Sequence, residues 1–295
     1  MSSADVAVKI FLQLEAEDLR VLQAIELAMA KHAYVPEAMI PKLANLNTDE
    51  TGFRIMRLQK LSLIKRQRGP YIGFVLNMAG YDALAINALV KAGVLQAFGK
   101  SLGIGKEADV YGALTPQNQQ VAVKFHRLGR TSFRQTRRKR GYIAKRMHIS
   151  WLYQSRLAAE KEYEALELLD AHRVAVPKPI SQNRHVVVMS MIDGAEIFEF
   201  DEIPDAENVL KEILLNLRKA YVKAGIVHGD FSEYNIILRP NGHILIIDWP
   251  QYVKRDHPSA EFLLERDLKN ILGFFRRKFG VKFELEKTLS YVKGE

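Results

Sequence analysis

Apolar positions in the first ninety residues follow a helical period at first and an alternating period later. One helix is indicated by four apolar residues that share a face: Leu19, Leu22, Ile25 and Met29. Residues 47–50 read Asn-Thr-Asp-Glu, a capping pattern that opens a second helix over about 48–60. Two predicted strands, 62–66 and 71–76, flank a Gly-Pro turn, and a further helix follows over about 80–92.

These elements have the order of a winged helix. A short segment at 35–46 stands between the first helix and the basic helix, so the order is helix, helix, basic helix, basic hairpin. In such a domain the third helix can enter a nucleic-acid groove while the hairpin touches the backbone. The candidate nucleic-acid contacts are the basic residues of these two elements: Arg54, Arg57, Lys60, Lys65, Arg66 and Arg68. Winged helices also bind proteins, so both kinds of partner stay open. We assign residues 1–92 to this domain, with its last helix as the linker.

From Ser101 the pattern changes to strands around a glycine-rich loop. Residues 102–111 resemble G-x-G-x-x-G-x-V, with Ala108 in place of the third glycine. Because glycines let backbone N–H groups approach phosphates closely, this loop supplies candidate ATP contacts: Gly103, Gly105, Lys106, Glu107 and Val110. The run Val-Ala-Val-Lys that ends at Lys124 matches the strand whose lysine meets the α and β phosphates of ATP.

The stretch that begins at His228 carries the most specific motif. It reads His-x-Asp-x-x-x-x-Asn, then an apolar strand, a turn, and a second strand that ends in Asp248. This is the layout of a phosphotransferase catalytic loop followed by its metal-binding aspartate. We expect Asp230 to meet the attacking hydroxyl. Asn235 and Asp248 would hold Mg²⁺, or Mn²⁺ in its place, against the ATP phosphates.

A hairpin explains the spacing of the two metal ligands. Residues 235–238 and 244–248 form its predicted strands, turned at Pro-Asn-Gly 240–242, and it would link Asn235 rigidly to Asp248. Asp248 also has a second candidate role. Its carboxylate could attack the γ-phosphate and form an acyl-phosphate, as carboxylates do in other ATPases. Metal binding and nucleophilic attack both stay open.

Between the two motifs the sequence predicts a helix over about 150–171 and a buried strand at 186–189. The helix offers four candidate ion-pair partners for the ATP lysine, and helical register does not choose among them: Glu160, Glu162, Glu164 and Glu167. Residues 190–194 resemble the hinge between two kinase lobes, where backbone groups bond adenine. Met189, Ser190 and Ile192 are the candidate adenine contacts.

The positive charge of the chain is concentrated in two segments. The chain has 295 residues and a net charge of +9, yet 51–81 and 110–159 contain no acidic residue. These two spans carry 17 positive charges, which leaves the rest of the chain at about −8. Charge of one sign in one place usually faces a polyanion. The second span adds four candidate nucleic-acid contacts: Arg137, Arg138, Lys139 and Arg140.

The composition of the chain excludes some kinds of cross-link and metal site and indicates where the protein is found. There is no cysteine, so disulfides and thiolate metal sites are excluded. No apolar run approaches the ~18 residues that span a bilayer, and we expect a soluble, cytoplasmic protein without membrane contact. The sequence does not fix the oligomeric state, and a monomer is our expectation.

At this point the residues resemble the RIO atypical kinases. The segments that carry the resemblance include 124–134, 150–157, 228–235 and 257–267, and the N-terminal winged helix is similar to that of the RIO kinase two subfamily. The resemblance implies that the glutamate of the triplet Lys-Glu-Tyr, Glu162, pairs with the ATP lysine. It also implies a serine-type kinase or ATPase that uses ATP and Mg²⁺. Its implied partners are the precursor of the small ribosomal subunit and the RNA of that particle.

We therefore predict an α+β fold: a winged helix, then a compact bilobal kinase-like RIO domain over 93–295. Its N-lobe is expected at about 93–189, its hinge at 190–194 and its C-lobe at about 195–295. Only 47 residues follow Asp248, too few for an activation loop and a peptide-docking subdomain. Autophosphorylation, ATP hydrolysis and transfer to a protein all stay open.

A small-molecule phosphotransferase of the aminoglycoside or choline kinase type is one alternative, and Trp249 after Asp248 favours it. A nucleic-acid-binding regulator with an inactive kinase lobe is another.

Overall fold

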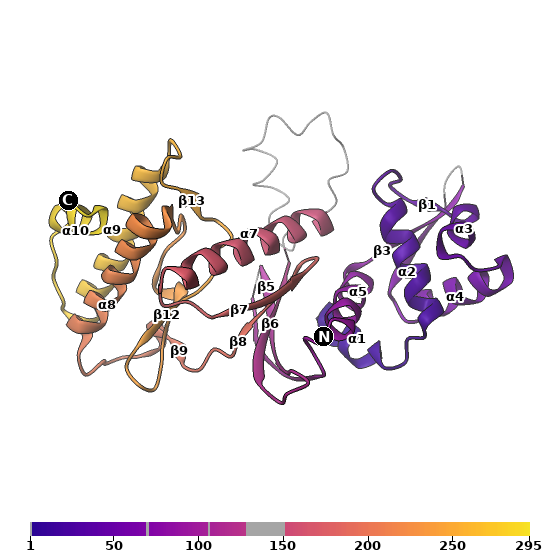
Figure 1. Ribbon diagram of the computed structural model, residues 1–295, viewed down its shortest axis with the longest axis horizontal. Coiled ribbons are helices and arrows are strands. Elements are labelled where there is room, and N and C mark those ends of the chain that lie inside the picture. The colour runs from indigo at the N-terminus through magenta and orange to yellow at the C-terminus, as the bar shows by residue number, and fades with distance from the viewer. Residues whose placement is uncertain (1, 69–70, 106, 128–150) are drawn as a thin grey trace. The chain divides into compact units, whose positions relative to one another are not determined.

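The computed structural model describes residues 2–68, 71–105, 107–127 and 151–295 (Figure 1). Backbone contacts divide the chain into two compact units. The first unit is Met1–Leu157 with Gln182–Val186, and the second is Ala158–Ser181 with Val187–Glu295. None of the described helices is both long enough and apolar enough to cross a membrane.

The first unit begins with the predicted winged helix, shown in indigo and purple in Figure 1. Its elements are α1 (Ser3–Phe11), α2 (Ala16–Ala28), β1 (Val35–Pro36), α3 (Ile40–Ala44), α4 (Thr48–Lys60), β2 (Ile64–Arg68), β3 (Ile72–Leu76) and α5 (Met78–Lys91). The strands form an antiparallel sheet in the order β1-β3-β2. The predicted cap is confirmed, because the Asn47 side chain accepts a hydrogen bond from the Glu50 N–H at 2.8 Å.

A five-stranded sheet follows in the order β4-β5-β6-β8-β7. Its strands are β4 (Ala97–Ile104), β5 (Ala108–Leu114), β6 (Gln120–His126), β7 (Pro179–Asn183) and β8 (Val186–Ser190). The boundary between the two units passes through β7 and β8, so these strands contribute residues to both. Helix α7 (Trp151–Ala171) precedes β7 in the chain.

Beyond β8, the second unit contains two small sheets and the helices α8, α9 and α10. The sheets are β12-β11-β9 and β10-β13, built from β9 (Ala195–Glu196), β10 (Ile226–Val227), β11 (Ile236–Leu238), β12 (Ile244–Ile246) and β13 (Val253–Lys254). The helices are α8 (Ala206–Lys219), α9 (Ala260–Phe279) and α10 (Leu285–Lys293). Helix α9 buries an apolar stripe with helical spacing: Leu264, Leu268, Ile271 and Phe275. Strand β13 and helices α9 and α10 follow Asp248 in the chain.

Candidate active site

The loop between β10 and β11 holds Asp230 in a fixed backbone frame. Asp267 of α9 accepts hydrogen bonds from the Gly229 N–H at 2.8 Å and from the Phe231 N–H at 3.1 Å. The amides on both sides of Asp230 are thus tied to one buried carboxylate. The Asp230 side chain is 77% exposed and projects from this frame. Such a group can reach a reacting atom without losing its backbone position.

Two further residues of α9 complete the frame. The Arg266 guanidinium donates to the Gly229 carbonyl at 2.5 Å and lies 3.9 Å from the Asp230 carboxylate. The Asn270 amide donates to the Phe231 carbonyl at 3.2 Å. The sequence motifs predicted no role for Asp267, Arg266 or Asn270. The signal that could have found them is a buried carboxylate inside the apolar stripe of an amphipathic helix, since such a group requires donors.

The predicted hairpin brings Asn235 close to Asp248. Strands β11 and β12 pair with Ile236 opposite Ile246, and the Ile247 N–H donates to the Asn235 carbonyl at 2.9 Å. Asp248 follows at once, with φ of +68°, a left-handed conformation that non-glycine residues rarely adopt. Strain of this kind persists where the surroundings impose it, and it is common at functional sites.

Asn235 is buried, and its side-chain oxygen is already used. It accepts hydrogen bonds from the Ser232 N–H at 3.0 Å and from the Ser232 hydroxyl at 3.1 Å. A carbonyl oxygen has two lone pairs. Coordination of a metal by this oxygen therefore requires the Ser232 hydroxyl to turn away.

His228 of the catalytic motif is a structural residue. Its ring is 2% exposed and packs against Trp249, with ring centroids 4.5 Å apart. Burial lowers the pKa of His228 below its ordinary value, so the neutral ring donates from Nε2 to the Ile247 carbonyl at 3.1 Å. This bond joins the loop that carries Asp230 to the strand that leads into Asp248.

The candidate hinge begins at the end of β8. Met189 is buried, and the Ser190 N–H donates to the Lys178 carbonyl at 2.8 Å. Because that N–H is used within the protein, only the carbonyl of Ser190 is left for the adenine contact, which remains a prediction. The hinge ends at Gly194, with φ of +137°, where a Cβ would lie 2.4 Å from the Leu238 carbonyl oxygen. Only glycine fits this close approach.

The phosphate-binding half of the expected site lies in the first unit. The glycine-rich turn joins β4 to β5, and the Gly105 N–H donates to the Ala108 carbonyl at 2.8 Å. A Cβ at Gly103 would meet no atom within 4 Å, so this part of the loop is open. Lys124 is 9% exposed on β6 and pairs in register with Val110. Glu107 is exposed, and Lys106 lies outside the described residues.

Burial distinguishes the four glutamates of α7. Glu162 is 1% exposed, whereas Glu160 is half-buried and Glu164 and Glu167 are exposed. A carboxylate is buried only where it has partners. This favours Glu162, the residue that the resemblance selected, and its pairing with the ATP lysine remains a prediction.

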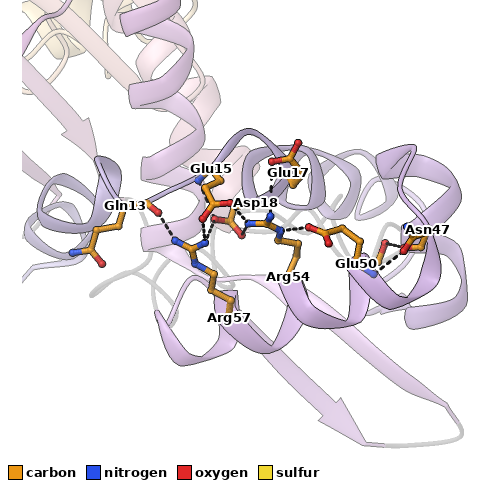
Figure 2. Close-up of polar contacts among 9 residues, drawn as sticks. Gln13, Glu15, Glu17, Asp18, Asn47, Glu50, Arg54 and Arg57 are labelled. Carbon is orange, nitrogen blue, oxygen red and sulfur yellow. Dashed lines mark hydrogen bonds and ion pairs between the residues drawn. The ribbon is translucent and has the colours of Figure 1, made fainter.

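Two of the candidate nucleic-acid contacts, Arg54 and Arg57, have acidic partners within the winged helix. Arg54 is 7% exposed and donates to Glu50 at 2.6 Å, to Glu15 at 2.8 Å and to Asp18 at 3.4 Å (Figure 2). Arg57 is partly buried and pairs with Glu15 and Asp18. Both guanidinium groups turn from α4 toward the start of α2 and form internal ion pairs of the winged helix, which counts against their predicted contact with nucleic acid. Except for Glu50, sequence spacing did not show these partners, because Glu15 and Asp18 lie about 40 residues earlier.

The other basic candidates remain predictions. Lys60, Lys65 and Arg66 are exposed on α4 and β2. The Arg68 side chain and residues 137–140 lie outside the part of the chain that the structure describes.

Two known protein families match this chain, one in its N-terminal part and one in its kinase-like part. The RIO domain family matches residues 109–288, and the family described as "Rio2, N-terminal" matches residues 11–92. The RIO-type serine/threonine-protein kinase Rio2 of Methanocaldococcus jannaschii is 41% identical over 273 residues, which cover 90% of this chain and 99% of that protein. The serine/threonine-protein kinase RIO2 of Caenorhabditis elegans is 40% identical over 92% of this chain and 51% of that longer protein.

A solved structure also matches nearly the whole chain. The Rio2 kinase of Chaetomium thermophilum, in an ADP/Mg²⁺-phosphoaspartate complex, is 34% identical, with a TM-score of 0.84 and coverage of 98% of this chain and 89% of that one. These matches span the winged helix as well as the catalytic loop, and they decide against an aminoglycoside or choline kinase. The chain belongs to the RIO family of serine/threonine-type protein kinases, in its Rio2 branch.

Proposed function

We propose that this kinase uses Mg²⁺-ATP, with Asp230 directed at the phosphate acceptor and Asp248 at the metal-bound phosphates. The observation that carries the proposal is the anchored loop. Asp267 fixes the amides on both sides of Asp230, while the hairpin places Asn235 beside the residue that precedes Asp248. Three functional groups of a phosphotransferase thus share one frame in the second unit.

Asn235 and Asp248 fit a magnesium ion that binds together with ATP. The amide oxygen of Asn235 and the carboxylate of Asp248 are hard oxygen donors, the kind that Mg²⁺ prefers. Among the described residues, no three His, Asp or Glu side chains gather closely enough to hold a metal ion. Phosphate oxygens would supply the remaining ligands, and the bound ion would neutralise charge on the β and γ phosphates.

Asp248 has two candidate roles, which are compatible. As a metal ligand it acts through charge alone. As a nucleophile, one carboxylate oxygen forms a bond to the γ-phosphorus while the bond to ADP breaks, and water later hydrolyses the acyl-phosphate to restore the carboxylate. The phosphoaspartate in the C. thermophilum kinase supports the second route.

We further propose that the kinase acts on the precursor of the small ribosomal subunit. The acid-free spans of the sequence, with Lys60, Lys65 and Arg66 exposed on the winged helix, support a partner rich in phosphate. Turnover on this particle by ATP hydrolysis or by transfer to a protein hydroxyl would use the same residues.

Paired variants test the division of roles. Asp230→Asn should abolish phosphotransfer to an acceptor while ATP affinity stays near that of the wild type, because Asp230 acts on the attacking group. Asp248→Asn should weaken magnesium-dependent ATP binding and remove any hydroxylamine-labile phosphate formed from labelled ATP. Equal loss of ATP affinity in both variants would contradict the proposed roles. Failure of the wild type to bind ATP with magnesium would instead indicate an inactive kinase lobe.

A further inference from the structure

A cluster of four fully buried ionisable side chains lies in the first unit. Asp82 of α5, Asp109 of β5, Arg127 at the end of β6 and His185 between β7 and β8 are each at most 1% exposed. Arg127 donates from both terminal nitrogens to the two oxygens of Asp82, at 2.7 and 3.0 Å, and from Nε to Asp109 at 2.9 Å. The His185 Nε2 lies 2.6 Å from Asp82 Oδ1 and 3.1 Å from Arg127 Nη1.

Such a cluster is a costly way to join two elements. Removing charges from water carries a large penalty, and well-packed apolar side chains often stabilise a junction equally well. What the cluster provides is a fixed orientation of the Arg127 side chain. A guanidinium held by two oxygens of one carboxylate and one oxygen of another has a single orientation.

The residue held in this way also binds the glycine-rich loop through its backbone. The backbone N–H of Arg127 donates to the Glu107 carbonyl at 2.6 Å, at the end of the loop that begins at Gly103. Asp109 lies two residues beyond Glu107, and Lys124 lies three residues before Arg127 on β6. One arginine therefore fixes the far end of the glycine-rich loop and the strand that carries the ATP lysine.

We propose that Arg127 is a positioning residue for the phosphate-binding half of the ATP site, and that Asp82 of the winged-helix domain holds it in place. The N-terminal domain is then part of the apparatus that shapes the glycine-rich loop. This inference rests on the proposed binding of ATP phosphates by that loop and Lys124.

A second ion pair of the same domain supplies a matched control. Arg184, next to His185, donates twice to the Glu26 carboxylate of α2, at 2.7 Å each time. This pair also ties a helix of the winged-helix domain to the turn between β7 and β8. No bond of either partner reaches the glycine-rich loop in the described structure.

The test compares Asp82→Asn with Glu26→Gln in the full chain. In Asp82→Asn we expect KM and Kd for ATP to rise about tenfold, as for one lost charge-assisted hydrogen bond, with a smaller change in kcat. Amide hydrogen exchange in residues 103–110 should accelerate. Glu26→Gln should lower the melting temperature and leave ATP affinity and loop exchange unchanged. Wild-type affinity and wild-type loop exchange in Asp82→Asn would overturn the proposal, as would equal changes in both variants.

If Asp82→Asn does not fold, the triple variant Asp82→Asn/Asp109→Asn/Arg127→Gln removes the guanidinium together with both carboxylates that bind it. The same rise in KM and the same faster exchange are expected of it, and wild-type values would overturn the proposal. Hydrogen exchange needs no nucleotide. A wild type that fails to bind ATP would therefore refute the proposed function, while the exchange result still decides whether Arg127 holds the loop.

Discussion

Asp267 offers the sharpest test of how the catalytic loop is held. It is 1% exposed on α9, and it accepts the Gly229 and Phe231 N–H groups that flank Asp230. The substitution Asp267→Asn keeps the shape of the side chain but replaces one acceptor oxygen with an NH₂ group. One of the two backbone donors then faces another donor and loses its bond.

The structure sets the size of the effect. A buried donor left without its acceptor costs about 1–3 kcal/mol. The loop can avoid this cost only by moving away from Asp267, and Asp230 would move with it. If the whole cost is expressed as displacement of Asp230 from its productive position, kcat falls roughly 5- to 150-fold, at about 1.4 kcal/mol for each factor of ten.

Steady-state kinetics and thermal unfolding together test this prediction. We expect Asp267→Asn to lower kcat with little change in KM for ATP, because the displaced group faces the acceptor. Glu261→Gln is the control, because Glu261 lies on α9 like Asp267 but pairs with Lys293 of α10 and, within the described residues, makes no bond to the catalytic loop. A lower melting temperature with unchanged kcat would show that Asp267 only stabilises the fold. A raised KM with unchanged kcat would place its effect on nucleotide binding.

Two further predictions concern stability. Burial lowers the pKa of His228 below 6.5, so the unfolded chain binds the proton more tightly and stability falls as the pH drops below about 6.5. The loss is up to about 1.4 kcal/mol per pH unit for each such residue, and His228→Gln should reduce this slope in denaturant titrations between pH 5.5 and 7.5. Arg54→Met leaves the fully buried Asp18 carboxylate short of a partner and should lower the free energy of unfolding by about 3 kcal/mol, with unchanged salt dependence of RNA binding. A weaker salt dependence in Arg54→Met would restore Arg54 as a phosphate contact.

Local sequence patterns predicted elements that are formed by neighbouring residues. The capping motif at Asn47 is confirmed, and so is the hairpin between Asn235 and Asp248, because both depend on residues a few positions apart. The phosphotransferase motifs could be found for the same reason. Chemistry that needs a fixed spacing within one loop or hairpin leaves that spacing in the sequence.

Contacts between distant segments could not be predicted in this way. Asp267 lies 38 residues after Gly229, and Arg127 lies 45 residues after Asp82. Neither pair has a spacing that local geometry dictates. Burial adds the missing information, because a carboxylate inside an apolar helix stripe must have donors, but only the fold shows which ones.

Charge is also decided by contacts between distant segments, and these contacts limit what the winged helix could contribute to the proposed binding of RNA. Its acid-free span holds six basic residues, but Arg54 and Arg57 are neutralised by acids of α2. Four candidates remain: Lys60, Lys65, Arg66 and Arg68. With 0.7–0.9 log units of affinity lost per log unit of salt for each phosphate neutralised, this domain can account for a slope of at most about 3–4. Replacing Lys65 and Arg66 by Ala should remove about 1.4–1.8 of that slope in binding measured against salt concentration. A slope well above 4 would require further contacts such as residues 137–140. An unchanged slope in the double variant would show that the hairpin does not touch the RNA.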